Sequence, residues 1–149
     1  MPTREDLTQK ILSAKRRKGL KWKGIAAELG PNSPIIYTAA LQGQFPLTLP
    51  EAQVAARLFD LDEEETLLLT EPPQRGTTAV MPPTDPLIYR FYELIQNYGM
   101  TWKLLIEEEF GDGIMSAIDF NMSIEREPNP AGDRVHINMS GKFLPFKRY

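Results

Sequence analysis

The chain has 149 residues, of which 42% are hydrophobic, and a formal net charge of -3. This length suits one compact domain or two small ones. The absence of cysteine excludes disulfides, thiol nucleophiles and thiolate metal sites, and the single histidine, His136, argues against a His-based triad or a multi-histidine metal site within one subunit.

The distribution of charged and apolar residues along the chain further narrows the class of protein. No apolar run approaches the roughly 20 residues of a membrane span, and the opening MPTREDLTQK has no stretch typical of a signal peptide. We therefore expect a cytoplasmic protein with no membrane partner. Residues 1–60 carry nine Lys or Arg against five Asp or Glu, whereas the remainder carries eight against fifteen. A basic N-terminal part can indicate a nucleic-acid-binding module, so nucleic-acid binding is considered below as one possible function.

The first seventy residues are expected to form short helices with distinct ends. Thr3 and Asp6 suit an N-cap and the carboxylate that supports it, and Gly19 can end the first helix. Four more helices are expected: Lys23 to Leu29, Ser33 and Pro34 to near Gly43, one opening at Pro50, and one capped by Asp62 and Glu65. This part of the chain is predicted to be all helical.

A proline-rich segment then interrupts the helical pattern. Residues 71–86, EPPQRGTTAVMPPTDP, contain five prolines and one glycine. Proline restricts its own backbone and disfavours helix at the residue before it. The sequence therefore predicts a helical domain over residues 1–72, a linker over 73–84 and a second domain over 85–149.

The second domain is predicted to begin with two helices. Asp85 and Pro86 suit the N-cap and first position of a helix that reaches Tyr98 and stops at Gly99. Another helix is expected from about Thr101 to Glu109, closed by the loop FGDG.

The end of the chain changes to the two-residue period of strands. Phe120, Met122 and Ile124 alternate with polar residues, as do Val135, Ile137 and Met139. The connection EPNPAGD is rich in turn formers, so two antiparallel strands are expected. Two strands and two helices over some sixty residues bury little surface, and a two-stranded ribbon is marginally stable by itself. We infer that this domain completes its core with other subunits.

The segment KWKGIAAELGPNSPIIYTAALQGQ resembles the helix-turn-helix of lambda-repressor-like domains. A helix that reads DNA needs side chains that reach base edges, typically Arg, Lys, Asn or Gln. The second helix would be PIIYTAALQGQ, whose interior has none of the basic residues and is apolar instead. The cluster Lys15 to Lys18 fits a solvated helix end, and as a DNA contact it would give only salt-sensitive, sequence-blind binding. A DNA-binding regulator is therefore the second-ranked function.

The stretch YRFYE places two charged residues among aromatic rings. Arg90 and Glu93 lie three positions apart, so they are neighbours on a helix surface, where an ordinary ion pair contributes a few tenths of a kcal/mol. The alternative is a small-anion site: Tyr89 and Tyr92 extend aromatic surface toward the charged face, and aromatic residues and Arg are enriched at interfaces. An enclosed arginine would offer a planar fork of donors to a carboxylate-like anion.

The stretch FGDGIMSAIDF supplies a serine just before the predicted first strand. Gly111 and Gly113 allow a tight turn with exposed N–H groups, and Ser116 adds a hydroxyl. No histidine is near it in sequence, so an activated nucleophile is a poor assignment. A structural role and a role as a hydrogen-bonding group to a ligand both remain open.

Taken together, PTDPLIYRFYELIQNYG, FGDGIMSAIDF and the closing GKFLPFKRY resemble the cyanase family, also known as cyanate hydratases or cyanate lyases. The resemblance extends over nearly the whole chain, because TAALQGQ and DLDEEETLLLTEPPQRG precede these motifs in the family's order. It implies an α+β fold, in which an N-terminal all-α lambda-repressor-like bundle is followed by a small dimerisation and catalytic domain with intertwined antiparallel strands.

The resemblance also implies an activity and its site. The family decomposes cyanate with bicarbonate as co-substrate, giving ammonia and carbon dioxide through carbamate, without metal or organic cofactor. Its catalytic positions fall on Arg90, Glu93 and Ser116, and its substrate-binding positions on Arg90, Ile114, Ser116 and Leu144 of this chain. The expected assembly is a homodecamer built as a pentamer of dimers, with sites between subunits, and nucleic acid is not an expected partner.

Overall fold

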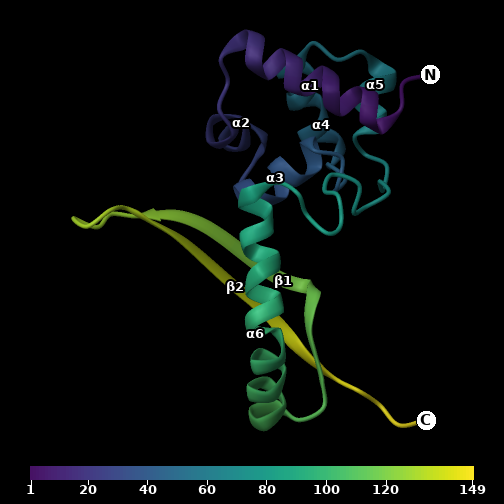
Figure 1. The fold of residues 1–149 in the computed structure, drawn as a ribbon. Coiled ribbons are helices and arrows are strands. Elements are labelled where there is room, and N and C mark those ends of the chain that lie inside the picture. Colours follow the sequence, from purple (N-terminus) through teal and green to yellow (C-terminus); the bar gives the residue numbers. More distant parts are fainter. The chain divides into compact units, whose positions relative to one another are not determined.

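The computed structural model describes all of residues 1–149 and divides them into two compact units, Met1–Thr78 and Ala79–Tyr149. The division falls within the proline-rich segment expected to act as a linker. The first unit contains α1 (Arg4–Lys18), α2 (Trp22–Leu29), α3 (Pro34–Leu41), α4 (Leu49–Phe59) and α5 (Glu63–Leu68). The second contains α6 (Pro86–Phe110), β1 (Gly113–Glu127) and β2 (Arg134–Pro145), as Figure 1 shows. The predicted α+β class is confirmed.

Local capping explains where the helices of the first unit begin and end. The Thr3 hydroxyl accepts from the backbone N–H of Asp6, whose carboxylate accepts from the N–H of Thr3, so the predicted capping box opens α1. Gly19 ends this helix in the left-handed conformation, with φ 65°. Asp62 and Glu65 form a second reciprocal pair at the start of α5, as predicted.

The first unit has a hydrophobic core of its own. Its largest fully buried side chains are Tyr37, Phe59, Leu7, Ile11, Leu41 and Leu69. The buried Tyr37 hydroxyl donates to Glu51 at 3.2 Å and accepts from the backbone N–H of Asn32. Burial of a polar atom is costly unless it is hydrogen-bonded, and this one has both kinds of partner. A Cβ at Gly30 would overlap the same hydroxyl, so glycine is required there.

The second unit begins with one long helix, so the prediction of two helices separated at Gly99 was wrong. α6 runs without interruption from Pro86 to Phe110, with Asp85 as the predicted N-cap. Gly99 is not among the glycines with positive φ, and it remains helical. A single glycine inside a helix costs about 1 kcal/mol relative to alanine, which lowers helix propensity without forcing an end. None of the helices combines the length and apolar character needed to cross a bilayer.

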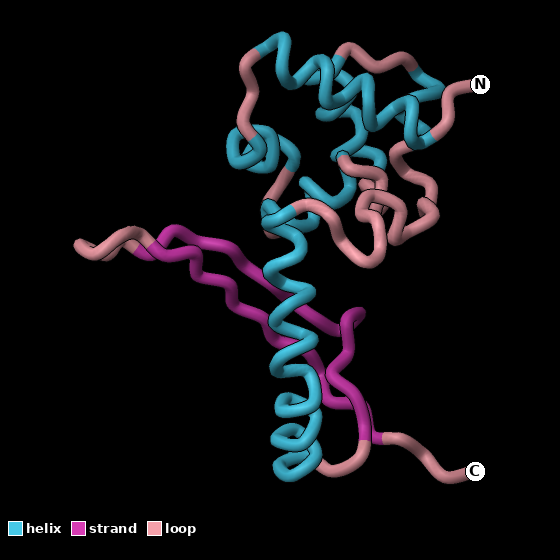
Figure 2. Tube along the Cα trace, in the orientation of Figure 1, coloured by secondary structure: helices cyan, strands magenta, loops and turns pink.

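The two strands form the predicted antiparallel ribbon, and the structure sets its register. Met122 lies opposite Met139, and Ile124 opposite Ile137. The trace of β1 bends sharply along its course (Figure 2), and its register with β2 is irregular between Met115 and Phe120. β1 begins at Gly113, earlier than predicted, so Ser116 lies within the strand and not before it. Alternation could not reveal this first part, because the irregularity breaks the two-residue period.

The second unit has almost no buried residues. Pro83 and Ser116 are the only residues of this unit that are buried, and α6 has none. An apolar stripe along α6 is exposed in the single chain, its members being Leu87, Ile88, Phe91, Leu94, Ile95 and Tyr98. Exposed apolar surface of this extent is unusual for a soluble monomer.

Candidate active site

Arg90 and Glu93 are neighbours on one face of α6, as their spacing predicted. Nη1 of Arg90 lies 3.8 Å from Oε2 of Glu93, and the side chains are 64% and 45% exposed. This separation is an ion pair that is too long for a hydrogen bond. Arg90 makes no hydrogen bond within the chain, so the N–H donors of its planar guanidinium have no partner there.

Two tyrosines flank this ion pair. The guanidinium carbon of Arg90 lies 5.8 Å from the centroid of the Tyr89 ring, within reach of a cation–π contact. The rings of Tyr89 and Tyr92 are 6.2 Å apart and tilted by 44°. The aromatic side chains thus contact the charged group and one another, which limits the directions that Arg90 can take.

Ser116 is buried and held by its own backbone. It is 4% exposed, and its Oγ accepts hydrogen bonds from the N–H groups of Ile118 at 3.0 Å and Asp119 at 2.9 Å. A serine hydroxyl can accept two hydrogen bonds and donate one. Both acceptor positions are occupied here, so the hydroxyl of Ser116 can make a further hydrogen bond only as a donor. This arrangement suits a hydrogen-bond donor and not a nucleophile.

Two further predicted residues face each other across the ribbon. Ile114 on β1 pairs with Leu144 on β2, next to the pair Met115 and Phe143 at which the irregular segment begins, and the two side chains are 50% and 41% exposed. The structure thus brings together Arg90 with Glu93, and Ile114 with Leu144. No hydrogen bond or ion pair joins Arg90 or Glu93 to Ser116 within the chain.

Gly141, which was not among the predicted site residues, pairs with Phe120 at the end of the irregular segment. A Cβ at this position would meet the carbonyl oxygen of Ser116. The signal was present in the sequence, because a glycine inside a strand often marks a bulge or a close backbone approach.

The surface of the first unit does not resemble a DNA-reading surface. Nζ of Lys15 lies 4.8 Å from the centroid of the Trp22 ring, and Arg17 and Lys18 both pair with Asp60. Most of the basic cluster is therefore engaged within the chain. The helix α3 exposes Pro34, leaves Ile35 and Ile36 half-buried, and carries no basic side chain.

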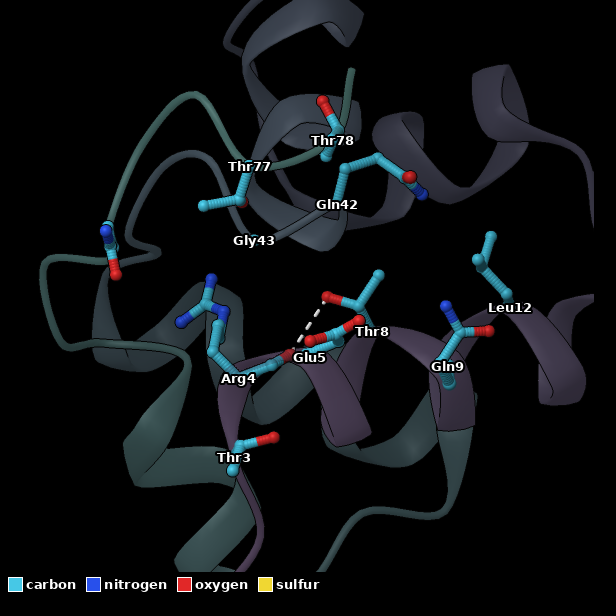
Figure 3. A pocket seen from close by; sticks show the side chains of 11 residues that line it. Thr3, Arg4, Glu5, Thr8, Gln9, Leu12, Gln42, Gly43, Thr77 and Thr78 are labelled. Carbon is cyan, nitrogen blue, oxygen red and sulfur yellow. Dashed lines mark hydrogen bonds between the residues drawn. The ribbon is translucent and has the colours of Figure 1, made fainter. Parts of the chain in front are cut away.

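The first unit also contains a polar cavity of about 490 Å³, lined in part by Arg4, Gln42, Thr77 and Thr78 (Figure 3). Arg4 is not free to bind an anion there, because its guanidinium donates to the carbonyl oxygens of Leu68, Ala40 and Phe45 at 2.7–3.0 Å. Burial lowers the pKa of Arg4 below its usual value, and the nearby charge of Glu71 opposes this shift. Arg4 stabilises the fold, and the cavity contains no residue predicted for the site.

Comparison with known proteins defines the class of protein to which this chain belongs. A family model described as the C-terminal domain of cyanate lyase matches residues 80–148, and one described as the N-terminal region of cyanate hydratase matches residues 4–73. The class is therefore a lyase. Relatives named cyanate hydratase are similar over nearly all of both chains: that of Methylibium petroleiphilum is 54% identical over 99% of each chain, and that of Ralstonia pickettii is 53% identical over 98% of this chain and 99% of its own.

A solved structure supports the same assignment. The crystal structure of cyanase from T. urticae superposes with a TM-score of 0.79 at 36% sequence identity, covering 93% of this chain and 96% of the other. The chain belongs to the cyanate hydratase family. None of the proteins named above is a DNA-binding regulator, and that alternative has no support.

Proposed function

We propose that the protein is a cyanate hydratase, which decomposes cyanate with bicarbonate to ammonia and carbon dioxide. The observation that carries the proposal is the full-length match to relatives of this name at about half identity, 54% in one case. Bicarbonate oxygen attacks the cyanate carbon, and the resulting dianionic mixed anhydride loses carbon dioxide to leave carbamate. Carbamate then releases ammonia and a second carbon dioxide, and the overall reaction consumes two protons.

The main obstacle to this reaction is repulsion between two anions. At a separation of 4 Å, two unit charges of the same sign cost about 1 kcal/mol in bulk water and about 4 kcal/mol at an effective dielectric constant of 20. Arg90 supplies a permanent positive charge whose donors are unused within the chain. We assign it the stabilisation of the anionic substrates and of the dianionic intermediate, since charge stabilisation is usually the largest catalytic contribution.

The other residues have supporting roles in the proposal. Ser116 donates its hydroxyl hydrogen to a substrate oxygen, which fits a hydroxyl whose acceptor positions are filled. Ile114 and Leu144, which face each other across the ribbon, provide an apolar wall of the site and backbone N–H groups beside the substrate. Glu93 orients Arg90. The reaction as proposed needs no metal or organic cofactor; no group of His, Asp and Glu side chains in the chain is arranged to hold a metal ion.

The site is proposed to be completed by other copies of the chain. The Arg90 side chain is 64% exposed in the single chain, so it cannot exclude water from a bound anion by itself. Apolar residues are exposed along α6 and on both strands, for example Ile95 at 57% and Val135 at 74%. We propose a cytoplasmic homodecamer, a pentamer of dimers with intertwined strands, in which these surfaces enclose sites between subunits, with no membrane or nucleic-acid partner.

The test of the activity is ammonia release from cyanate, measured with bicarbonate and in buffer from which carbon dioxide has been removed. Bicarbonate-dependent release is expected, with a rise in pH under weak buffering because protons are consumed. Absence of ammonia at every bicarbonate concentration would exclude the proposed function. Sizing by light scattering tests the assembly separately, and a monomer would contradict it.

A further inference from the structure

The irregular segment of the ribbon surrounds Ser116. Met115 pairs with Phe143 and Phe120 pairs with Gly141, so residues 116–119 of β1 lie opposite the single residue Lys142 of β2. The extra length of β1 forms a bulge of several residues. Bulges redirect side chains, and they are often found beside functional sites.

The bulge is closed by hydrogen bonds to Ser116 and not by pairing with β2. The N–H groups of Ile118 and Asp119, which lack partners on β2, donate to Oγ of Ser116. The same two bonds fix the rotamer of the serine. The direction of its remaining O–H bond therefore depends on the shape of the bulge.

Gly141 lies against the backbone of this bulge. A Cβ at Gly141 would meet the carbonyl oxygen of Ser116 and would lie 2.6 Å from Cγ of Met115 and 3.2 Å from Cδ2 of Phe120. The backbone of Gly141 is not in the left-handed region, so any residue could adopt its conformation. Glycine is required here because of space, and the space is filled by the peptide of Ser116.

We propose that Gly141 is a positioning residue for Ser116, an inference that rests on the proposed function. Its missing side chain lets the bulge approach β2 closely enough to bury Ser116 and to aim the hydroxyl hydrogen at the substrate anion. A methyl group at position 141 must push the peptide of Ser116 away. Because a displacement of about 1 Å at a reacting group can cost about 100-fold in rate, Gly141→Ala is expected to lower kcat by about 10-fold to 100-fold.

The test compares Gly141→Ala, Ser116→Ala and the double variant in the assembled protein. Gly24→Ala is the matched control, because a Cβ at Gly24 meets no atom within 4 Å, and it is expected to retain normal kcat and KM. If Gly141 acts through Ser116, adding Gly141→Ala to Ser116→Ala lowers kcat by less than twofold further. A general structural defect would instead multiply the two losses.

Each outcome decides the inference. Normal kcat in Gly141→Ala, or full multiplication of the two losses, overturns it while leaving the proposed function intact. Normal kcat in Ser116→Ala overturns it as well, and a wild-type protein without activity overturns both proposals. If Gly141→Ala does not assemble, the same variants are compared in a protein that also carries Met115→Ala, which removes the side chain closest to a Cβ at position 141. If Gly141→Ala does not assemble in this second background either, the inference is contradicted, because the fold as a whole would then require Gly141.

Discussion

Arg90 and Glu93 face each other across one turn of α6 at 3.8 Å, and the contact leaves the guanidinium donors of Arg90 unused. Arg4 shows the opposite arrangement, since its guanidinium donates to three backbone carbonyls. One arginine therefore stabilises a fold, and the other is available to a ligand. This difference is why we propose Arg90, and not Arg4, as the residue that binds the anions.

Replacing Arg90 with leucine is expected to abolish turnover while leaving the assembly largely intact. The loss should be at least 100-fold in kcat, because the variant removes the positive charge that offsets repulsion between two anions. Ammonia release and light scattering of the same sample are the measurements. Lys103→Met is the matched control, since Lys103 is also an exposed cation paired within α6, to Glu107 at 2.8 Å. Near-normal turnover by a correctly assembled Arg90→Leu protein would remove Arg90 from the site.

Glu93→Gln is expected to retain more activity than Glu93→Ala. Glutamine preserves the length and an oxygen beside Arg90, whereas alanine leaves the guanidinium without a neighbour at 3.8 Å. We expect losses in kcat of about 10-fold and about 100-fold respectively, in the range of single hydrogen-bonding and proton-transfer groups. The pH profile of kcat separates the two roles of Glu93. Disappearance of the acidic limb in Glu93→Gln would identify a proton-transfer group and contradict a purely orienting role.

Glu65 links two helices of the first unit, and its removal should lower the free energy of unfolding. Its carboxylate is nearly buried, accepts from Nζ of Lys10 at 2.7 and 2.9 Å, and accepts from the backbone N–H of Asp62 at 2.9 Å. Glu65→Ala loses both a cap and a charged hydrogen bond, and should cost about 1–3 kcal/mol in denaturant unfolding followed by circular dichroism. Glu64→Ala, at an exposed position in the same turn, should change stability little. Equal effects of the two variants would show that the hydrogen bonds of Glu65 to Lys10 and Asp62 contribute nothing to stability.

Asp60 is expected to make stability depend on pH below neutrality. The hydrogen bond from Lys18 lowers the pKa of Asp60 below its usual value, and the charges of Lys18 and Arg17 act in the same direction. A carboxylate with a lowered folded-state pKa stabilises the fold above its unfolded pKa of about 4, and this contribution is lost as pH falls through the folded value. Asn at position 60 tolerates the left-handed backbone, with φ 56°, but cannot ionise.

Thermal unfolding of wild type and Asp60→Asn between pH 3 and pH 7 therefore tests whether the ion pairs of Asp60 with Arg17 and Lys18 stabilise the fold. Wild type should unfold at the higher temperature at pH 7, and the two midpoints should converge as pH falls below about 4. A difference that persists unchanged to pH 3 would mean that the charge of Asp60 is not its source.

The sequence by itself determined the features that depend on near neighbours. The capping boxes at Thr3 and Asp62, the glycine end of α1 and the two antiparallel strands were all predicted, because each follows from contacts within a few residues or from a two-residue period. The adjacency of Arg90 and Glu93 was predicted for the same reason. The family was also evident from the ordered motifs.

Only the tertiary structure decided the features that depend on residues far apart in the chain. α6 continues through Gly99 because one unfavourable residue cannot outweigh the hydrogen bonds of the turns on either side. The burial of Ser116 depends on Gly141, twenty-five positions later, through the register of β1 with β2. A two-residue alternation of apolar and polar residues predicts a regular strand and does not reveal a bulge. The position of the Ser116 hydroxyl therefore follows only from the pairing of β1 with β2.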